Sequence, residues 1–311
     1  MVGERVGNQS STPYPIPHPP TPTNRLTGVA AVLGAVLIWG LTFVPSKVAL
    51  AEMGPFTLAV LRFCVALAIL LPTLARSRLR SVEFRQLPWR TLAALGFTGV
   101  AVYFGFQNLG LARTSATEAG LISGAVPAVT AALSALVLHE RLRIPRILGI
   151  AGSMAGVAVM ILASSSTQGG SLAGDLLMLV SAVAWAFYTL MNKEIGGKLP
   201  EGLLLVSTIA FGALFLAPGA IFEIVTAGFG PISADGWLAV LFLGLAGSAG
   251  AFFCWNAALR RLDASEASTY LNLVPLVTVL SAALMLGERP TPPQLLGGAL
   301  VIAGVYLADK Q

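Results

Sequence analysis

Charged residues are scarce in this chain. Only 11% of its 311 residues are Asp, Glu, Lys or Arg, whereas 56% are hydrophobic. A soluble globular protein carries about a quarter of its residues as charged side chains, which cover its water-facing surface. The composition therefore excludes an ordinary soluble enzyme and predicts that most of the surface faces lipid.

The residues that carry catalytic or metal chemistry are also few. Both cysteines, Cys64 and Cys254, lie inside apolar segments, which excludes the disulfide framework of a small secreted domain. The only histidines are His18 and His139, and neither belongs to an H-E-x-x-H motif. The aspartates lie in loops or at segment ends, so no deep catalytic pair is expected. We therefore predict no catalytic residues, no metal site and no cofactor.

What the chain has instead is a series of ten apolar segments. Each is long enough to cross roughly 30 Å of hydrocarbon at about 1.5 Å per helical residue. The segments are 27–51, 55–75, 89–111, 114–138, 143–163, 174–193, 202–226, 235–260, 264–286 and 293–308. Residues 1–26 are rich in proline and polar residues, which predicts a disordered cytoplasmic tail with no secretory signal peptide. The fold class expected is an all-α integral membrane protein.

The basic residues are sorted by loop. If the N-terminus is cytoplasmic, only Lys47, Arg62, Arg113 and Arg289 lie outside or within the membrane. The remaining 15 of the 19 basic residues fall on the inside: Arg5, Arg25, Arg76, Arg78, Arg80, Arg85, Arg90, Arg141, Arg143, Arg146, Lys193, Lys198, Arg260, Arg261 and Lys310. This asymmetry matches the positive-inside rule. It predicts a multi-pass protein of the cell membrane, the inner membrane in a bacterium, with both termini cytoplasmic and no nucleic-acid partner.

An internal repeat divides the ten segments into two halves. Residues 106–142 align without a gap on residues 254–290 at an offset of 148, with 15 identities in 37 positions. A weaker match at an offset of 146 places Trp39 on Trp185. The halves, 27–163 and 174–308, hold five segments each. Because five is odd, the second half must enter the membrane from the opposite side.

Inverted repeats of this kind are typical of alternating-access transporters, whose substrate site lies near the midplane between the halves. We therefore expect ten transmembrane helices, arranged as two inverted five-helix repeats around a central cavity. The repeat predicts a carrier without identifying its substrate.

Particular motifs also resemble a known family. The segment Trp39-Gly40-Leu41-Thr42-Phe43, and the paired signatures from Pro127 to Glu140-Arg141 and from Pro275 to Glu288-Arg289, resemble the two EamA domains of the drug/metabolite transporter superfamily. Within it the chain resembles bacterial exporters of amino acids and related metabolites, including the YddG type that exports aromatic amino acids. The resemblance implies ten helices around a central cavity and leaves the substrate open.

Aromatic and amide residues on the helices that the resemblance places inside form the predicted substrate site. Rings would stack on the apolar part of a small metabolite, and amides would orient its polar part. The alternative for the Trp and Tyr residues is an anchor at the membrane interface, and an amide can instead bond a neighbouring helix. The candidates are Trp39, Phe43, Tyr103, Gln107, Trp185, Tyr188, Asn192, Trp255, Asn256, Tyr270 and Asn272.

Three further residues carry a possible role in transport. Pro127 and Pro275 fall in mid-span at matching places of the repeat, as a hinge or as a static kink. Arg62 lies eight residues into the second segment, where a cation is costly unless it is paired or functional. It either stabilises the fold, through backbone carbonyls or lipid headgroups, or acts in gating or in binding a substrate carboxylate.

Other sequence features concern packing at the helix edges. Glu140-Arg141 and Glu288-Arg289 end the fourth and ninth segments, which predicts an ion pair or a headgroup contact that fixes the depth of each helix. Glycines of the fifth and tenth segments would let helices approach closely, within one chain or across a dimer; they are Gly149, Gly152, Gly156, Gly297, Gly298 and Gly304. Because one chain holds both halves, we expect a monomer.

The function predicted is a secondary transporter that exports amino acids, aromatic ones among them, or related small metabolites. Its partners are then a small-molecule substrate and the lipid bilayer. A channel, a scramblase-like pore, or a carrier of a different metabolite or drug class are the alternatives, and a polytopic membrane enzyme is the least favoured.

Overall fold

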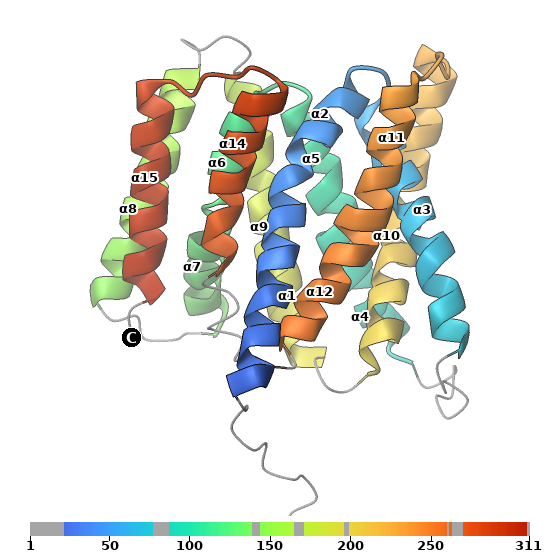
Figure 1. Cartoon of the computed structure of the whole chain (residues 1–311), viewed down its shortest axis with the longest axis horizontal. Helices are drawn as coiled ribbons and strands as arrows, with labels where there is room; N and C mark the ends of the chain where they lie inside the picture. The colour runs from blue at the N-terminus through green and yellow to red at the C-terminus, as the bar shows by residue number, and fades with distance from the viewer. Residues whose placement is uncertain are drawn as a thin grey trace, which may run out of the picture.

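The computed structural model describes residues 22–76, 87–138, 144–164, 171–195, 199–259, 261–262 and 270–309. Within these ranges all regular structure is helical, and the helices form a single bundle (Figure 1). The helices of the first half are α1 (Pro22–Leu41), α2 (Phe43–Leu50), α3 (Pro55–Arg76), α4 (Trp89–Gly96), η3 (Phe97–Val102), α5 (Tyr103–Leu111), α6 (Ala116–Ser123), α7 (Val126–Leu138) and α8 (Ile144–Ser164).

The second half follows a similar order, except that α9, the counterpart of α1 and α2, is continuous. Its elements are α9 (Leu172–Ile195), α10 (Glu201–Ala227), α11 (Ala234–Phe242), η4 (Leu243–Gly250), α12 (Ala251–Leu259), η5 (Leu271–Leu273), α14 (Val274–Met285) and α15 (Pro292–Asp309). Both η3 and η4 are π-helical, whereas η5 is one 3₁₀ turn. The start of α1 and the end of α15 lie at the same end of the bundle (Figure 1).

Seven helices of the described chain are long and apolar enough to cross a membrane, which makes this a multi-pass membrane protein. They are Arg25–Leu50, Pro55–Pro72, Trp89–Leu111, Ala116–Ser134, Leu172–Asn192, Gly202–Ala227 and Ala234–Trp255. Three shorter apolar helices, Ile147–Ala163, Leu271–Met285 and Pro292–Leu307, fall within the other three predicted segments. The all-helical class is confirmed, and the count of ten spans stays a prediction. Helix α1 begins at Pro22, within the predicted tail, because proline fits the first turn of a helix.

Helices at equivalent positions of the two halves pack against each other. The pairs α3 with α10, α6 with α14, and α8 with α15 are in contact, and α1 contacts α12 as α9 contacts α5. Each of the first three pairs runs antiparallel. The start of α3 meets Glu223 near the end of α10, and the start of α6 meets Glu288 just after α14. Equivalent helices therefore point in opposite directions, as an inverted repeat requires.

The predicted glycine contacts lie between α8 and α15 of the same chain. A Cβ added to Gly156 would lie 2.5 Å from the carbonyl oxygen of Gly297, and one added to Gly304 would lie 2.6 Å from that of Gly149. Such distances leave no room for a side chain. Gly298 instead faces Leu121 of α6. The structure accounts for these glycines by packing within one chain.

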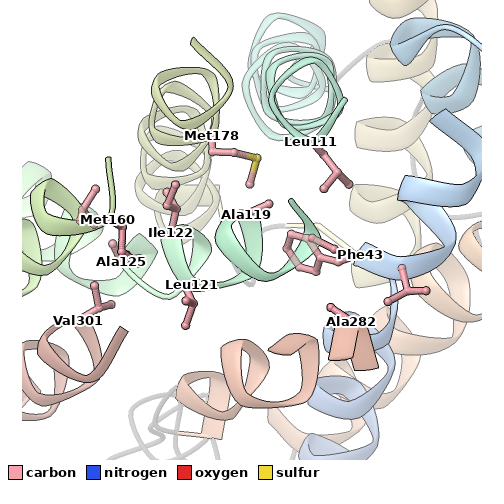
Figure 2. Close-up of a cluster of buried hydrophobic side chains, with 13 residues drawn as sticks. Phe43, Leu111, Ala119, Leu121, Ile122, Ala125, Met160, Met178, Ala282 and Val301 are labelled. Atoms are coloured by element: carbon pink, nitrogen blue, oxygen red, sulfur yellow. The ribbon is translucent and has the colours of Figure 1, made fainter. Parts of the chain in front are cut away.

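Helix α6 lies at the centre of the largest buried cluster. Its residues Ala116 to Ile122 are all buried, because helices surround it on every side. Figure 2 shows Ala119, Leu121 and Ile122 of α6 among side chains of the neighbouring helices. These neighbours are Phe43, Leu111, Met160, Met178, Ala282 and Val301. The helix that supplies one wall of the central cavity is therefore rigidly held.

Three glutamates connect the two halves, because the carboxylate of each accepts hydrogen bonds from backbone N–H groups at the start of a helix in the other half. These contacts lie at the start of α3, α6 and α11, which is the upper end of the bundle in Figure 1. The Glu288 carboxylate accepts hydrogen bonds from the N–H groups of Ala116 and Thr117, at 2.9 and 2.8 Å. The ion pair or headgroup contact predicted for Glu288 is thus wrong, because its carboxylate caps the positive end of α6. Glu223 caps α3 in the same way, and Glu52 caps α11. Glu140 and Arg141 lie outside the described residues.

Candidate functional site

A central cavity of about 830 Å³, including the part open to solvent, lies between the halves. Both halves contribute to its wall, which is mostly apolar with a few polar groups. The lining residues are Trp39, Thr42, Phe43, Arg62, Tyr103, Phe104, Gln107, Ser123, Gly124, Val126, Pro127, Trp185, Gly247, Phe252, Leu271, Val274 and Pro275.

The cavity lies where helices lose their regular hydrogen bonding. Pro127 and Pro275 have no N–H, so the carbonyls of Ser123 and Leu271 lose their usual donor four residues ahead. All four residues line the cavity. The break between α1 and α2 also lines the cavity. Pro45 has no N–H to bond the Leu41 carbonyl four residues earlier, and α1 ends at Leu41. Prolines thus place polar backbone at the centre of an apolar bundle, where only a protein or water-filled interior tolerates it.

Aromatic rings form the two sides of the cavity. The ring centroids of Trp39 and Phe252 are 5.6 Å apart, and those of Tyr103 and Trp185 are 4.8 Å apart. The Gln107 side chain donates a hydrogen bond from Nε2 to the Tyr103 hydroxyl at 2.9 Å. These rings and this amide can receive the apolar and polar parts of one small molecule.

Arg62 of α3 carries the charge of this site. Its side chain is only 3% exposed. Nε donates to Ser248 Oγ at 3.2 Å and Nη2 to the Leu243 carbonyl at 3.5 Å, both in η4 of the other half. The guanidinium also lies over the Phe104 ring, 4.7 Å from its centroid. The π-helical turns of η4 thus position the cation, and a contact between Arg62 and lipid headgroups is excluded by its burial.

The structure brings together most of the residues predicted from the sequence. Trp39, Phe43, Tyr103, Gln107, Trp185, Pro127, Pro275 and Arg62 all line the cavity. For Trp39 and Trp185 this replaces the alternative of an anchor at the membrane interface. Tyr188 packs behind Trp185 and Trp255 behind Trp39, with centroids 5.0 and 5.8 Å apart.

The remaining candidates lie away from the lining. Tyr270 packs against the apolar cluster of Val32, Ala258 and Leu262. Asn272 follows the lining residue Leu271 in η5, and Asn192 is half-buried near the end of α9. The side chain of Asn256 lies outside the described residues.

Several lining residues were missed from the sequence, and the repeat carried the signal for some of them. Phe104 and Phe252 are related by the offset of 148, as are Val126 and Val274. None of these four residues was a candidate, so the offset would have led from one to its partner only after one of them had been identified. Gly247 had no local signal, because a glycine in an apolar segment does not reveal a π-helical turn.

Two buried carboxylates occupy a separate place in the bundle. Thr114 Oγ1 lies 3.0 Å from Glu118 Oε2 and 2.8 Å from Asp175 Oδ1, and both acids are fully buried. Glu118 lies in the first turn of α6, and its backbone N–H donates to the Ser115 hydroxyl, which caps the helix. In the part of the chain that the structure describes, no group of acidic, His and Cys side chains is arranged to hold a metal.

Known proteins are similar in sequence to this chain over about 90% of its length. A Salmonella typhimurium protein named "Probable amino-acid metabolite efflux pump" is 33% identical over 296 residues, covering 91% of this chain and 95% of that protein. An "Uncharacterized transporter" of Archaeoglobus fulgidus is 32% identical, covering 89% of this chain and 95% of its own. A "Probable terminal-alkyne amino-acid exporter" of Streptantibioticus cattleyicolor is 29% identical, covering 91% and 93%.

The fold and the family agree with these relatives. A chain of known crystal structure superimposes with a TM-score of 0.63 at 24% identity, covering 91% of this chain and 97% of that one, which shows the shared fold. The model of the EamA-like transporter family matches twice, at residues 26–162 and 172–308. Matches to transporters identify a membrane transporter rather than an enzyme. The chain belongs to the EamA-like transporter family.

Proposed function

We propose that this protein is a secondary exporter of amino acids or related small metabolites, working by alternating access between two inverted five-helix repeats. The observation that carries the proposal is the central cavity, walled by both halves and lined by residues that the repeat relates to one another. A site on the axis between two halves is where an alternating-access carrier holds its substrate. The names of the Salmonella and Streptantibioticus relatives support amino acids as the substrate class.

The membrane arrangement proposed is ten spans with both termini cytoplasmic. Three antiparallel pairs of equivalent helices support the inversion, and the cytoplasmic side follows from the basic residues of the loops. The end that carries the glutamate caps is then the outer end. Because one chain supplies both walls of the cavity, the proposed working unit is a monomer.

Within the cavity, the proposed substrate ligands are the aromatic residues and Gln107. Trp39 and Trp185 are equivalent residues of the repeat and face the cavity from opposite halves. They would hold the apolar part of an amino acid between them, with Phe43 and Tyr103 beside it. Pro127 and Pro275 are the proposed hinges, since each interrupts a helix at the cavity wall.

Transport by purified protein in proteoliposomes tests this function. Labelled phenylalanine, methionine and threonine should show saturable flux, and an excess of unlabelled substrate on the opposite side should accelerate it. Flux that rises linearly with concentration and shows no counterflow would instead establish a channel or scramblase-like pore. If all three amino acids fail and another class of solute moves, the fold interpretation stands and the amino-acid function is wrong.

A pair of tryptophan variants locates the site. Trp39→Leu removes a ring from the cavity, whereas Trp237→Leu removes one from the exposed side of α11. We expect Trp39→Leu to raise the KM for phenylalanine about five- to 150-fold, since stacked aromatic contacts and apolar burial of one ring are worth ~1–3 kcal/mol. Trp237→Leu should leave KM unchanged.

A further inference from the structure

The cavity has one charge, and it is positive. Among the described residues that line it, Arg62 alone is charged, and the polar remainder consists of hydroxyl groups, one amide and backbone carbonyls. We propose that the cavity recognises a carboxylate attached to an aromatic or apolar group and does not require an ammonium group. This inference rests on the proposed function, because it assigns the substrate class of the same site.

The guanidinium of Arg62 is held with bonding capacity to spare. It has five N–H groups, of which the structure uses one on Nε and one on Nη2. Nη1 has no hydrogen bond within the described part of the chain. A planar guanidinium binds a carboxylate through two parallel hydrogen bonds, and this geometry suits it better than any single carbonyl.

The burial of the Arg62 guanidinium favours the binding of an anion beside it. The side chain is 3% exposed inside a membrane protein, where a cation without a counter-charge is costly. Its neighbours Phe63 and Phe104 contribute only their ring faces, with centroids 5.4 and 4.7 Å from Cζ. A carboxylate arriving in the cavity supplies the missing negative charge. Its own loss of hydration is then offset by a fixed, desolvated partner.

Gly247 keeps the approach to the guanidinium open. This lining residue belongs to η4, and a Cβ there would lie 3.2 Å from Arg62 Nη2 and 2.8 Å from Thr42 Cγ2. Any larger residue would push on both side chains. The π-helical segment thus serves twice, since Ser248 and Leu243 fix the cation while Gly247 leaves space beside it.

The rest of the wall suits a ring rather than a second charge. Trp39 and Phe252 from one side, and Tyr103 and Trp185 from the other, enclose the centre. An ammonium group placed here meets ring faces, neutral acceptors and the like charge of Arg62, but no acidic side chain among the described lining residues. The cavity should therefore accept an amino acid through its carboxylate and ring and tolerate the loss of its amino group.

Three probes that differ by one charged group each test this inference. They are L-phenylalanine, 3-phenylpropionate, which lacks the amino group, and 2-phenylethylamine, which lacks the carboxylate. Binding to the purified protein is measured by calorimetry near neutral pH, where the charged groups of all three are ionised, so that passive leakage through a bilayer plays no part. We expect 3-phenylpropionate to bind as tightly as phenylalanine or more tightly, and the amine at least about tenfold more weakly, as expected where one good ligand contact is missing.

Variants of the arginine connect this ranking to the guanidinium. Arg62→Gln should weaken both carboxylates at least about tenfold and remove their advantage over the amine. Arg62→Lys should retain part of that advantage, because the charge remains and the forked geometry is lost. Arg113→Gln is the matched control, since the Arg113 side chain is exposed just after α5 and, among the described residues, bonds the Leu109 carbonyl; this variant should bind all three probes like the wild type.

The outcomes separate the inference from the function it rests on. If phenylalanine is transported but the amine binds as well as 3-phenylpropionate, the carboxylate inference is overturned and the exporter stands. If phenylalanine is not transported while 3-phenylpropionate binds in an Arg62-dependent way, the amino-acid function fails and the inference stands. If no probe binds, the inference is wrong. The ranking of the probes on the wild-type protein decides even where Arg62→Gln does not fold.

Discussion

The two halves of this protein share a frame, but only the first contributes a charged residue to the described cavity lining. Helices α3 and α10 pack against each other, and the offset of 146 relates Arg62 of α3 to Thr208 of α10. Both side chains are 3% exposed. Arg62 reaches across to Ser248 in the opposite half, whereas Thr208 Oγ1 has no hydrogen-bond partner among the described residues. Duplication therefore relates parts of the cavity wall, such as Trp39 and Trp185, whereas the charge of Arg62 has no counterpart in the second half.

Moving the charge to the other half gives the largest expected effect. The double variant Arg62→Thr with Thr208→Arg should lose at least about tenfold in phenylalanine transport and several kcal/mol in stability, because position 208 offers no acceptor set for a buried cation. A Cβ at its neighbour Gly96 would already lie 2.8 Å from the Thr208 carbonyl oxygen, so space is short as well. Counterflow in proteoliposomes and thermal unfolding in detergent measure the two losses.

Thr208→Val is the matched control for this exchange. It removes a hydroxyl with no partner and keeps the shape, so stability should stay the same or rise. Recovery of wild-type transport in the double variant would show that the halves are interchangeable, and the chemical asymmetry would then be wrong.

The glycines of α8 and α15 test what the halves have in common. Gly156→Ala and Gly304→Ala are equivalent changes, since the offset of 148 relates them and each adds a Cβ against a backbone carbonyl oxygen, at 2.5 and 2.6 Å. Each should cost about 1–3 kcal/mol of unfolding free energy by overpacking. Thermal unfolding followed by circular dichroism compares them.

Gly230→Ala is the control, because a Cβ at that position meets nothing within 4 Å. Its effect should stay within about 0.5 kcal/mol. Unequal losses of stability for Gly156→Ala and Gly304→Ala would mean that α8 and α15 relax differently around the added methyl group. The two halves would then not be energetically equivalent at this contact.

The sequence predicted the seven long apolar helices well because hydropathy and length are local properties. It also identified Arg62, since a cation in an apolar segment is conspicuous without any knowledge of its neighbours. The partner of Arg62 was not predictable, because Ser248 lies 186 residues further along the chain and becomes a neighbour only after folding. The interpretation of Glu288 failed for the same reason: its partners, 172 and 171 residues away, are backbone N–H groups that give no signal in a sequence.

The cavity itself was half predictable. Trp39 and Gln107 could be selected because Trp and Gln are uncommon in apolar segments. Phe104 and Phe252 could not be distinguished from phenylalanines that face lipid. Two of the helix breaks were predictable from prolines, because each proline lacks the N–H that would bond the carbonyl four residues earlier in the same helix. The π-helical turns of η3 and η4 could not be predicted, since their wider turns depend on packing across the bundle.

Pro127 and Pro275 test whether both halves bend during transport. Pro127→Ala and Pro275→Ala each restore an N–H that can bond the carbonyl four residues earlier. We expect both variants to slow transport by similar factors while their thermal stability is unchanged or higher. Pro218→Ala, in α10 and outside the cavity lining, should leave the transport rate unchanged. An effect of Pro127→Ala alone would assign the hinge to one half, and no effect of either would make both static kinks.

The smallest effect is expected where the halves meet in water. Glu52 of the first half accepts hydrogen bonds from the backbone N–H and the hydroxyl of Ser233, at 2.8 and 2.6 Å, and so caps α11 of the second half. These bonds hold the pKa of the Glu52 carboxyl below its usual range. A pKa that is lower in the folded protein than in the unfolded chain gives stability that is present above the unfolded value and is lost as pH falls through the folded one. Thermal unfolding from about pH 7 down to about pH 3 should therefore show a small acid-side loss, which Glu52→Gln diminishes. Glu52→Gln melting with the same pH profile as the wild type would mean that this contact contributes nothing to joining the halves, and that the part-buried caps made by Glu223 and Glu288 suffice.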